Sequence, residues 1–276
     1  MKKKIFIGIG IGILIVITIF LASLTRTPSH SRNWELGHDK LPQIQINGND
    51  IVVKNLRDFT WDEDGSADGK YITDNFDLNK MNSLDVVISH FDSFEGIAHI
   101  FITFGFEDDK HIVVSVETRR EDDEEFSTIQ GLLNKFELIY VVGTERDIIG
   151  TRTNVRGERV YLYNVNADNS TIKELFKLIA QDVNKIYDSP VFYNTLSHNC
   201  TNAITRRAEE VADIKFPFSY KMLLPGYVDE VLYDMDIIEH KGTLEETREK
   251  AQIDNDKVNY LASDYSEQIR NNFIIE

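Results

Sequence analysis

The chain has 276 residues, 42% of them hydrophobic, and a formal charge of −16 at neutral pH. This length and apolar content are enough for one sizeable domain with a hydrophobic core. The excess of carboxylates argues against nucleic acid as a partner, because nucleic-acid binding depends on many Lys and Arg contacts to phosphates. It also gives no bulk attraction to anionic lipid.

The first predicted element is an apolar N-terminal segment. Three lysines follow Met1, and residues 5–24 form an apolar run without a charged side chain. A helix of this length spans the roughly 30 Å hydrocarbon core of a bilayer, so we expect one transmembrane helix, an uncleaved signal anchor over residues 1–26. The alternative is a cleaved secretory signal, whose apolar region is usually about 7–15 residues long. The lysines place the N-terminus in the cytoplasm and the rest of the chain in the periplasm or on the outer face of the cytoplasmic membrane.

A polar tether and one continuous domain are expected to follow. Residues 27–42 carry two of the five prolines, which is typical of a tether, and residues 43–276 show no internal repeat. Strands are indicated by a hairpin signal at Asn47-Gly48 and by "GIAHIFITFGF", "HIVVSVETR", "FELIYVV" and "ERVYLYNV". Helices are indicated by capping boxes at Thr171-x-x-Glu174 and Thr243-x-x-Glu246, by "CTNAITRRAEEVA", and by the final "KVNYLASDYSEQIRNNF". Strands followed by helices predict an α+β domain.

Cys200 is the only cysteine, so it has no partner within the chain in a compartment where thiols tend to become disulfides. Asn199 before it is a good N-cap residue, which places Cys200 at the first helical position. Free backbone N–H groups and the helix dipole at that position lower a thiol's pKa and offer donors to an oxyanion. The helix start suits a nucleophile, but from this segment alone a buried inert thiol is the simpler interpretation, and a disulfide between two chains is a third.

A cysteine nucleophile needs a base, which is usually a histidine. His99 lies within an apolar strand that we expect to be covered on both faces, and a hydrogen-bonded core histidine is the simpler interpretation. If Glu107–Asp109 form a three-residue turn with Asp109 in the left-handed region, His99 comes opposite Glu117 and Ser115 shares their face. A four-residue turn would put both polar residues on the other face.

The other histidines are weaker candidates. His30 and His38 fall in the expected tether and His240 in a polar stretch, so these three are expected on the solvated surface. The side chain of His198 would leave the helix start in a different direction from Cys200. His111 would share the face of Ser115 and is a second candidate for the polar role.

Four segments in this order resemble the Lnb N-terminal periplasmic domain family: "GIAHIFITFGFEDDKHIVVSVETRRE", "GLLNKFELIYVVGTERDIIGTRTNVR", "VFYNTLSHNCTNAI" and "LLPGYVDEVLYD". That family is similar to circularly permuted NlpC and papain-like cysteine enzymes and to lecithin:retinol acyltransferase. The resemblance implies a permuted papain-like domain with a central antiparallel sheet packed on helices, and it implies Cys200 and His99 as the catalytic pair. It also implies a role in bacterial lipoprotein N-acylation. The chain departs from the family at Asn202, where a second threonine is expected, and it lacks the multi-spanning region of Lnb itself.

The site residues have the following expected roles. Cys200 attacks an ester or amide carbonyl, His99 transfers the proton, and Glu117 or Ser115 orients the imidazole. The candidate oxyanion or substrate-binding residues are Asn199, Tyr193 and Thr201.

Two arginines are further substrate-binding candidates. Arg152 and Arg156 are suited to a phosphate head group, and the simpler interpretation is ion pairs with neighbours such as Glu145, Asp147 and Glu158. We expect no cofactor and no metal site, because the single cysteine and the scattered histidines lack ligand spacing.

Three functions fit these residues. The first is a membrane-anchored, extracytoplasmic thiol acyltransferase or hydrolase with membrane lipid as partner and a lipoprotein amine as one acceptor. The second is a cell-wall amidase or peptidase of NlpC type, acting on peptidoglycan. The third is a catalytically silent binding or assembly module of the envelope.

Overall fold

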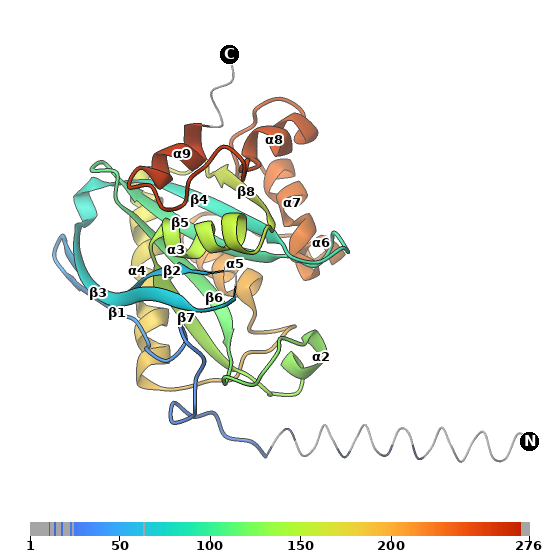
Figure 1. Cartoon of the computed structure of the whole chain (residues 1–276). Helices are drawn as coiled ribbons and strands as arrows, with labels where there is room; N and C mark the ends of the chain where they lie inside the picture. Colours follow the sequence, from blue (N-terminus) through green and yellow to red (C-terminus); the bar gives the residue numbers. More distant parts are fainter. Residues whose placement is uncertain are drawn as a thin grey trace, which may run out of the picture.

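The computed structural model describes residues 25–62 and 64–271, together with Ile11, Leu14, Thr18 and Ser23. Within these residues an eight-stranded sheet forms the centre of the molecule, and helices cover its faces (Figure 1). The strands are β1 (Gln43–Asn47), β2 (Asp50–Trp61), β3 (Ala67–Asp77), β4 (Met81–His90), β5 (His99–Phe106), β6 (His111–Arg119), β7 (Glu137–Gly143) and β8 (Arg159–Asn164).

Most of the helices follow the strands in the chain. They are α2 (Thr128–Gly131), α3 (Glu145–Gly150), α4 (Asn169–Asp188), α5 (Cys200–Val211), α6 (Tyr220–Leu223), α7 (Val228–Asp234), α8 (Leu244–Ala251) and α9 (Tyr265–Asn271). A π-helical turn at Thr151–Val155 continues α3, and short 3-10 turns lie at Leu78–Lys80 and Pro225–Tyr227.

The sheet has the order β1-β2-β7-β6-β5-β4-β8, and β3 pairs with β2 beside this path. All adjacent strands are antiparallel except β2 and β7, which run parallel where Arg57 pairs with Gly143. The α+β class agrees with the sequence, but the expected antiparallel sheet was wrong. The sheet is mixed, because the chain enters β7 from the same end as β2.

The expected transmembrane helix is also corrected. Its residues 5–24 lie outside the described part of the chain, apart from four isolated positions. Among the residues that the structure describes, none of the helices combines the length and the apolar character needed to cross a bilayer. The described residues therefore form an α+β domain with a mixed sheet, and the transmembrane helix that the predicted fold class included is not among their helices.

Alternation along the strands divides the core into two layers. Even-numbered residues of β5, such as Ile100 and Ile102, pack in a large cluster with α4 and with Cys200 of α5. Odd-numbered residues such as Phe101 pack in a second cluster with Ile148 of α3 and with α9. His99 is the first residue of β5, so it lies at one end of this strand.

The hairpin that carries His99 has the predicted register. Asp109 has a φ of 57°, and the Phe106 N–H donates to the Lys110 carbonyl at 3.0 Å, so the turn has three residues. Ile102 then pairs with Val114 and Gly105 with His111. This register puts His99, Ser115 and Glu117 on one face, as predicted.

Local signals along the chain were mostly reliable. The hairpin at Gly48, the Asn199 N-cap and the capping box at Thr243 are confirmed. The helix predicted from Thr171 begins earlier, because Asp168 accepts hydrogen bonds from the N–H groups of Ser170 and Thr171. Strands β3 and β4 were not predicted.

Part of the expected tether packs on the domain. The Ser29 N–H and the Arg32 side chain donate to Glu137, and the buried Arg119 guanidinium donates to the His38 carbonyl at 2.8 Å. His38 is only 3% exposed, so its expected place on the solvated surface was wrong. Residues 29–39 thus form part of the folded unit.

Candidate active site

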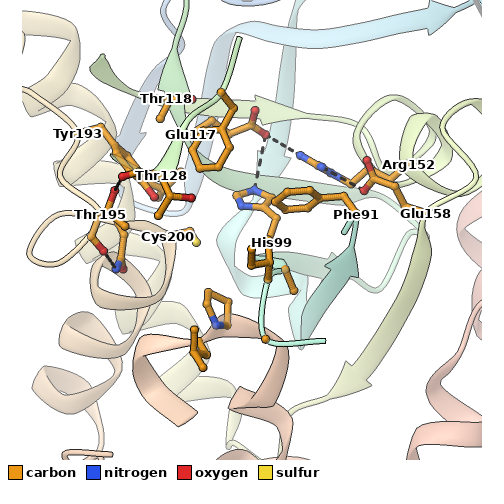
Figure 2. Close-up of a pocket in the computed structure, with 18 of the residues that line it drawn as sticks. Phe91, His99, Glu117, Thr118, Thr128, Arg152, Glu158, Tyr193, Thr195 and Cys200 are labelled. Carbon is orange, nitrogen blue, oxygen red and sulfur yellow. Dashed lines mark hydrogen bonds and ion pairs between the residues drawn. The ribbon is translucent and has the colours of Figure 1, made fainter. Parts of the chain in front are cut away.

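A cavity of about 290 Å³ lies where the start of β5, the C-terminal part of β6 and the N-terminus of α5 meet. His99, Glu117 and Cys200 line it together, and Figure 2 shows the Cys200 sulfur and the His99 ring facing the same space. The three residues are far apart in sequence. The hairpin register and the helix start bring them together.

Cys200 occupies the first turn of α5, as the sequence predicts. The Asn199 side chain accepts from the Asn202 N–H at 2.8 Å and so caps the helix. The Cys200 thiol is free and 5% exposed. Burial raises the pKa of this thiol, and hydrogen bonds from the Ile100 N–H, the Thr201 hydroxyl and the N–H groups of Thr201 and Cys200 oppose the rise. The lowered pKa expected at the helix start was therefore wrong, because burial outweighs these donors. The resting cysteine is therefore a neutral thiol whose sulfur already lies beside donors that stabilise negative charge.

A hydrogen-bonded chain fixes the tautomer of His99. Ser115 Oγ donates to Glu117 Oε1 at 2.8 Å, and His99 Nε2 lies 2.6 Å from the same Ser115 oxygen. Because the single hydroxyl hydrogen goes to the carboxylate, Ser115 accepts from His99, which places the proton on Nε2. Nδ1 then carries the lone pair and is the basic nitrogen.

Glu117 is held as a carboxylate by groups on both sides. Arg152 Nη2 lies 3.1 Å from Glu117 Oε1, and His38 Nε2 lies 3.5 Å from Oε2. Burial alone would raise the pKa of Glu117, but the hydrogen bond from His38 and the positive charge of Arg152 hold it well below its usual value. The ionised carboxylate is an acceptor only, which keeps the direction of the chain through Ser115.

His99 is a neutral imidazole in this environment. Burial, followed by the charge of Arg152, lowers the pKa of His99 to about 3, although Glu117 acts in the opposite direction. The imidazole ring stacks on the Phe101 ring at 5.4 Å between centroids, and the Arg152 guanidinium lies 5.3 Å from the centre of the Phe101 ring. No hydrogen bond joins His99 and Cys200, both of which belong to the described part of the chain. The arrangement is thus an uncharged thiol and base that share a cavity, rather than a preformed ion pair.

The three candidate oxyanion residues have different positions. Tyr193 lines the cavity, and burial together with the nearby Cys200 raises the pKa of its hydroxyl, so it stays a donor. Asn199 also lines the cavity, but its amide donates to the Thr195 carbonyl at 2.7 Å while its oxygen caps α5. Thr201 is fully buried and outside the cavity lining. Tyr193 is therefore the side-chain donor best placed for a developing oxyanion.

The two candidate substrate-binding arginines also differ. Arg152 is 8% exposed and contacts Glu117 and Glu158. Arg156 has a side chain 49% exposed and lies 3.7 Å from Glu158, so its guanidinium is the freer of the two. The other predicted ion-pair neighbours are bound elsewhere, because Asp147 pairs with Arg57 and Glu145 with Arg270. Both arginines line the cavity, and Arg152 also orders Glu117.

Some candidates lie away from the site, and some contributors were not foreseen. His111 shares the face of Ser115 but lies 3.7 Å from Glu145, in a different cavity. His38 and the Ile100 N–H are at the site without having been predicted, since neither a buried N-terminal segment nor a strand amide has a signal in the sequence. Within the described residues, groups of three or more His, Cys, Asp or Glu side chains that could hold a metal ion are absent.

Comparison with known proteins identifies a family. The model of the Lnb N-terminal periplasmic domain matches residues 67–226, which is more than half of the chain and includes both His99 and Cys200. None of the curated proteins and none of the solved structures matches the chain.

Proposed function

The chain belongs to the Lnb N-terminal periplasmic domain family, and from this premise we propose that it is an extracytoplasmic thiol acyltransferase or hydrolase. The observation that carries the proposal is the chain from Glu117 through Ser115 to His99, which leaves Nδ1 basic in the cavity that Cys200 lines. A nucleophile, a base and a group that orients the base are the parts that nucleophilic catalysis requires.

The proposed reaction begins with transfer of the Cys200 thiol proton to His99 Nδ1 as the sulfur attacks an acyl carbonyl carbon. The carbonyl oxygen becomes an oxyanion that accepts from the Tyr193 hydroxyl. The tetrahedral intermediate collapses when the bond to the leaving group breaks and the leaving group takes the proton from His99. An amine, an alcohol or water then attacks the thioester carbonyl carbon and gives its proton to His99. The C–S bond breaks, the acyl product leaves, and His99 returns the proton to the Cys200 sulfur, which restores the thiol.

The lining of the cavity favours a fatty-acyl substrate over a cell-wall peptide. Phe91, Phe126, Leu223 and Leu224 are among the residues that line it. Apolar walls stabilise an alkyl chain through burial at roughly 25 cal/mol per Å², whereas a polar stem peptide needs hydrogen-bonding partners. Membrane lipid is therefore the proposed acyl donor, and a lipoprotein amine remains one possible acceptor.

Intact-protein mass spectrometry tests this proposal. The full chain is incubated separately with phospholipid and with muropeptides, and a mass increase equal to a fatty-acyl group on Cys200 is expected with phospholipid alone. Cys200→Ala and His99→Ala should abolish the adduct, while His240→Ala, a change at an exposed histidine stacked on Tyr233, should retain it. An adduct from muropeptides alone would establish the amidase or peptidase alternative. Full biological activity in both the Cys200 and the His99 variants would leave only the catalytically silent module.

A further inference from the structure

Large apolar side chains are exposed on four segments that also contribute to the lining of the Cys200 cavity. They come from the β4–β5 loop, the segment containing α2, the loop before α5, and the segment containing α6. We call them the apolar rim: Phe91, Phe94, Phe126, Ile129, Leu132, Leu196, Phe218, Tyr220 and Leu223. Phe218 is 99% exposed and Ile129 is 71% exposed, so their positions are not explained by packing within the described part of the chain.

The four segments of the rim are neighbours in space. The rings of Phe91 and Phe126 lie 6.4 Å apart, which joins the β4–β5 loop to the α2 segment. Thr195 Oγ1 donates to the Thr128 carbonyl at 3.0 Å, which joins α2 to the loop carrying Leu196. Three members of the rim also line the cavity itself, and α2 and α6 lie on the same side of the molecule in Figure 1.

An apolar surface of this extent marks a contact with another apolar phase, because leaving large hydrocarbon side chains in water is unfavourable. Because all four segments of the rim also line the cavity, a folded protein seated on the rim would cover the cavity. Lipid chains can contact the rim and enter the cavity at the same time. We propose that the apolar rim inserts into the surface of a lipid bilayer, with the mouth of the Cys200 cavity facing the lipid.

The charges beside the rim specify the kind of bilayer. Asp122, Asp123 and Glu125 are exposed immediately before Phe126. Lys221, within the α6 segment, pairs with Glu230 at 2.7 Å and is not free to bind an anionic head group. Apolar insertion flanked by carboxylates fits a zwitterionic surface, and anionic lipid should weaken the contact.

Environment-sensitive fluorophores placed on the rim test the proposal. The full chain with Cys200→Ala, which lacks the native thiol, receives Leu196→Cys or Phe218→Cys for labelling. Tyr187→Cys and Leu261→Cys are matched controls, since these residues are 40% and 57% exposed and lie outside the rim. Each labelled protein is mixed with phosphatidylcholine vesicles, with and without doxyl-labelled lipid, and with vesicles in which phosphatidylglycerol replaces a third of the lipid.

Both rim labels are expected to brighten roughly twofold or more on phosphatidylcholine and to be quenched by doxyl lipid, while both control labels stay unchanged. The response should fall when phosphatidylglycerol is present. Equal responses at rim and control positions would overturn the proposal, as would a rim response that rises with protein concentration in the absence of vesicles. Because the comparison uses Cys200→Ala, its outcome is independent of the acyl-transfer proposal.

Discussion

The hydroxyl of Ser115 determines which nitrogen of His99 is basic, because it accepts from Nε2 and donates to Glu117. Ser115→Ala removes this acceptor and lets the imidazole adopt the other tautomer. We expect kcat for ester cleavage to fall about 10- to 100-fold with little change in KM, since the substrate cavity is untouched. Ser115→Thr retains a hydroxyl at a strand position and should restore most of the rate. Steady-state kinetics of the two variants check this, and an Ala variant as active as the parent would contradict the tautomer argument.

Burial and the charge of Arg152 together determine the acid limit expected for the proposed reaction. The base must be neutral, and burial followed by Arg152 lowers the pKa of His99 to about 3, so the parent rate should persist to about that pH while the chain stays folded. Arg152→Gln removes a charge that lowers the pKa of His99, while the Glu117 carboxylate, which raises this pKa, stays in place. The pKa of His99 should therefore rise. The acid limb of kcat/KM is therefore expected to move to higher pH. An unmoved limb would show that Arg152 has no electrostatic effect on the base.

At the scale of elements, the start of α5 depends on one side chain. Asn199 caps the helix through its oxygen and ties it to the preceding loop through its amide. Asn199→Ala should lower the free energy of unfolding by about 1 kcal/mol, whereas Asn199→Asp retains the capping acceptor and should recover most of that loss. Urea unfolding of the two variants measures the difference. If Asp is no better than Ala, the tie to Thr195 and not the cap controls stability.

Residues 29–39 are bound to the sheet by Arg119, which is 2% exposed. Its guanidinium donates to the carbonyls of His38 and Asp39 and lies 4.2 Å from the Trp34 ring. Arg119→Ala should cost about 3 kcal/mol and expose this segment to protease, because a buried charged donor and its contacts are lost. Arg146→Ala, which breaks a pair with Asp58 at 2.6 Å, should cost less than about 1 kcal/mol, and limited proteolysis of the two variants tests the contrast.

At the scale of the whole molecule, buried titratable groups make stability depend on pH. Burial alone would raise the pKa of Glu145, but Arg270 lowers it to about 2, and His99 is lowered to about 3. Both folded-state values lie below the unfolded values of 4.5 and 6.5, so the unfolded chain binds more protons in acid. Unfolding free energy is therefore expected to fall as pH drops below about 6.5 and to keep falling to about 2. His99→Gln should flatten the upper part of this range in urea titrations, and an unchanged profile would contradict the assignment.

Features that depend on neighbouring residues were predicted correctly from the sequence, whereas contacts between distant segments were not. Asp109 in the left-handed region and Asn199 at the helix start are local features, and they place Ser115, Glu117 and Cys200 correctly on their elements. The parallel pairing of β2 with β7 joins residues far apart in the chain, Arg57 and Gly143, so no short-range sequence pattern predicts it. The contact between His38 and Glu117 was missed for the same reason.

The division of the core into two layers determines when Cys200 and His99 come together during folding. Cys200 belongs to the layer of α4 and α5, while the ring beneath His99 belongs to the layer of α3 and α9. If only one layer has assembled, either Cys200 is in place without His99 or His99 is in place without Cys200. The proposed transfer of the thiol proton to His99 therefore requires both layers to have closed on the sheet, because only the complete domain brings Cys200 and His99 to one cavity.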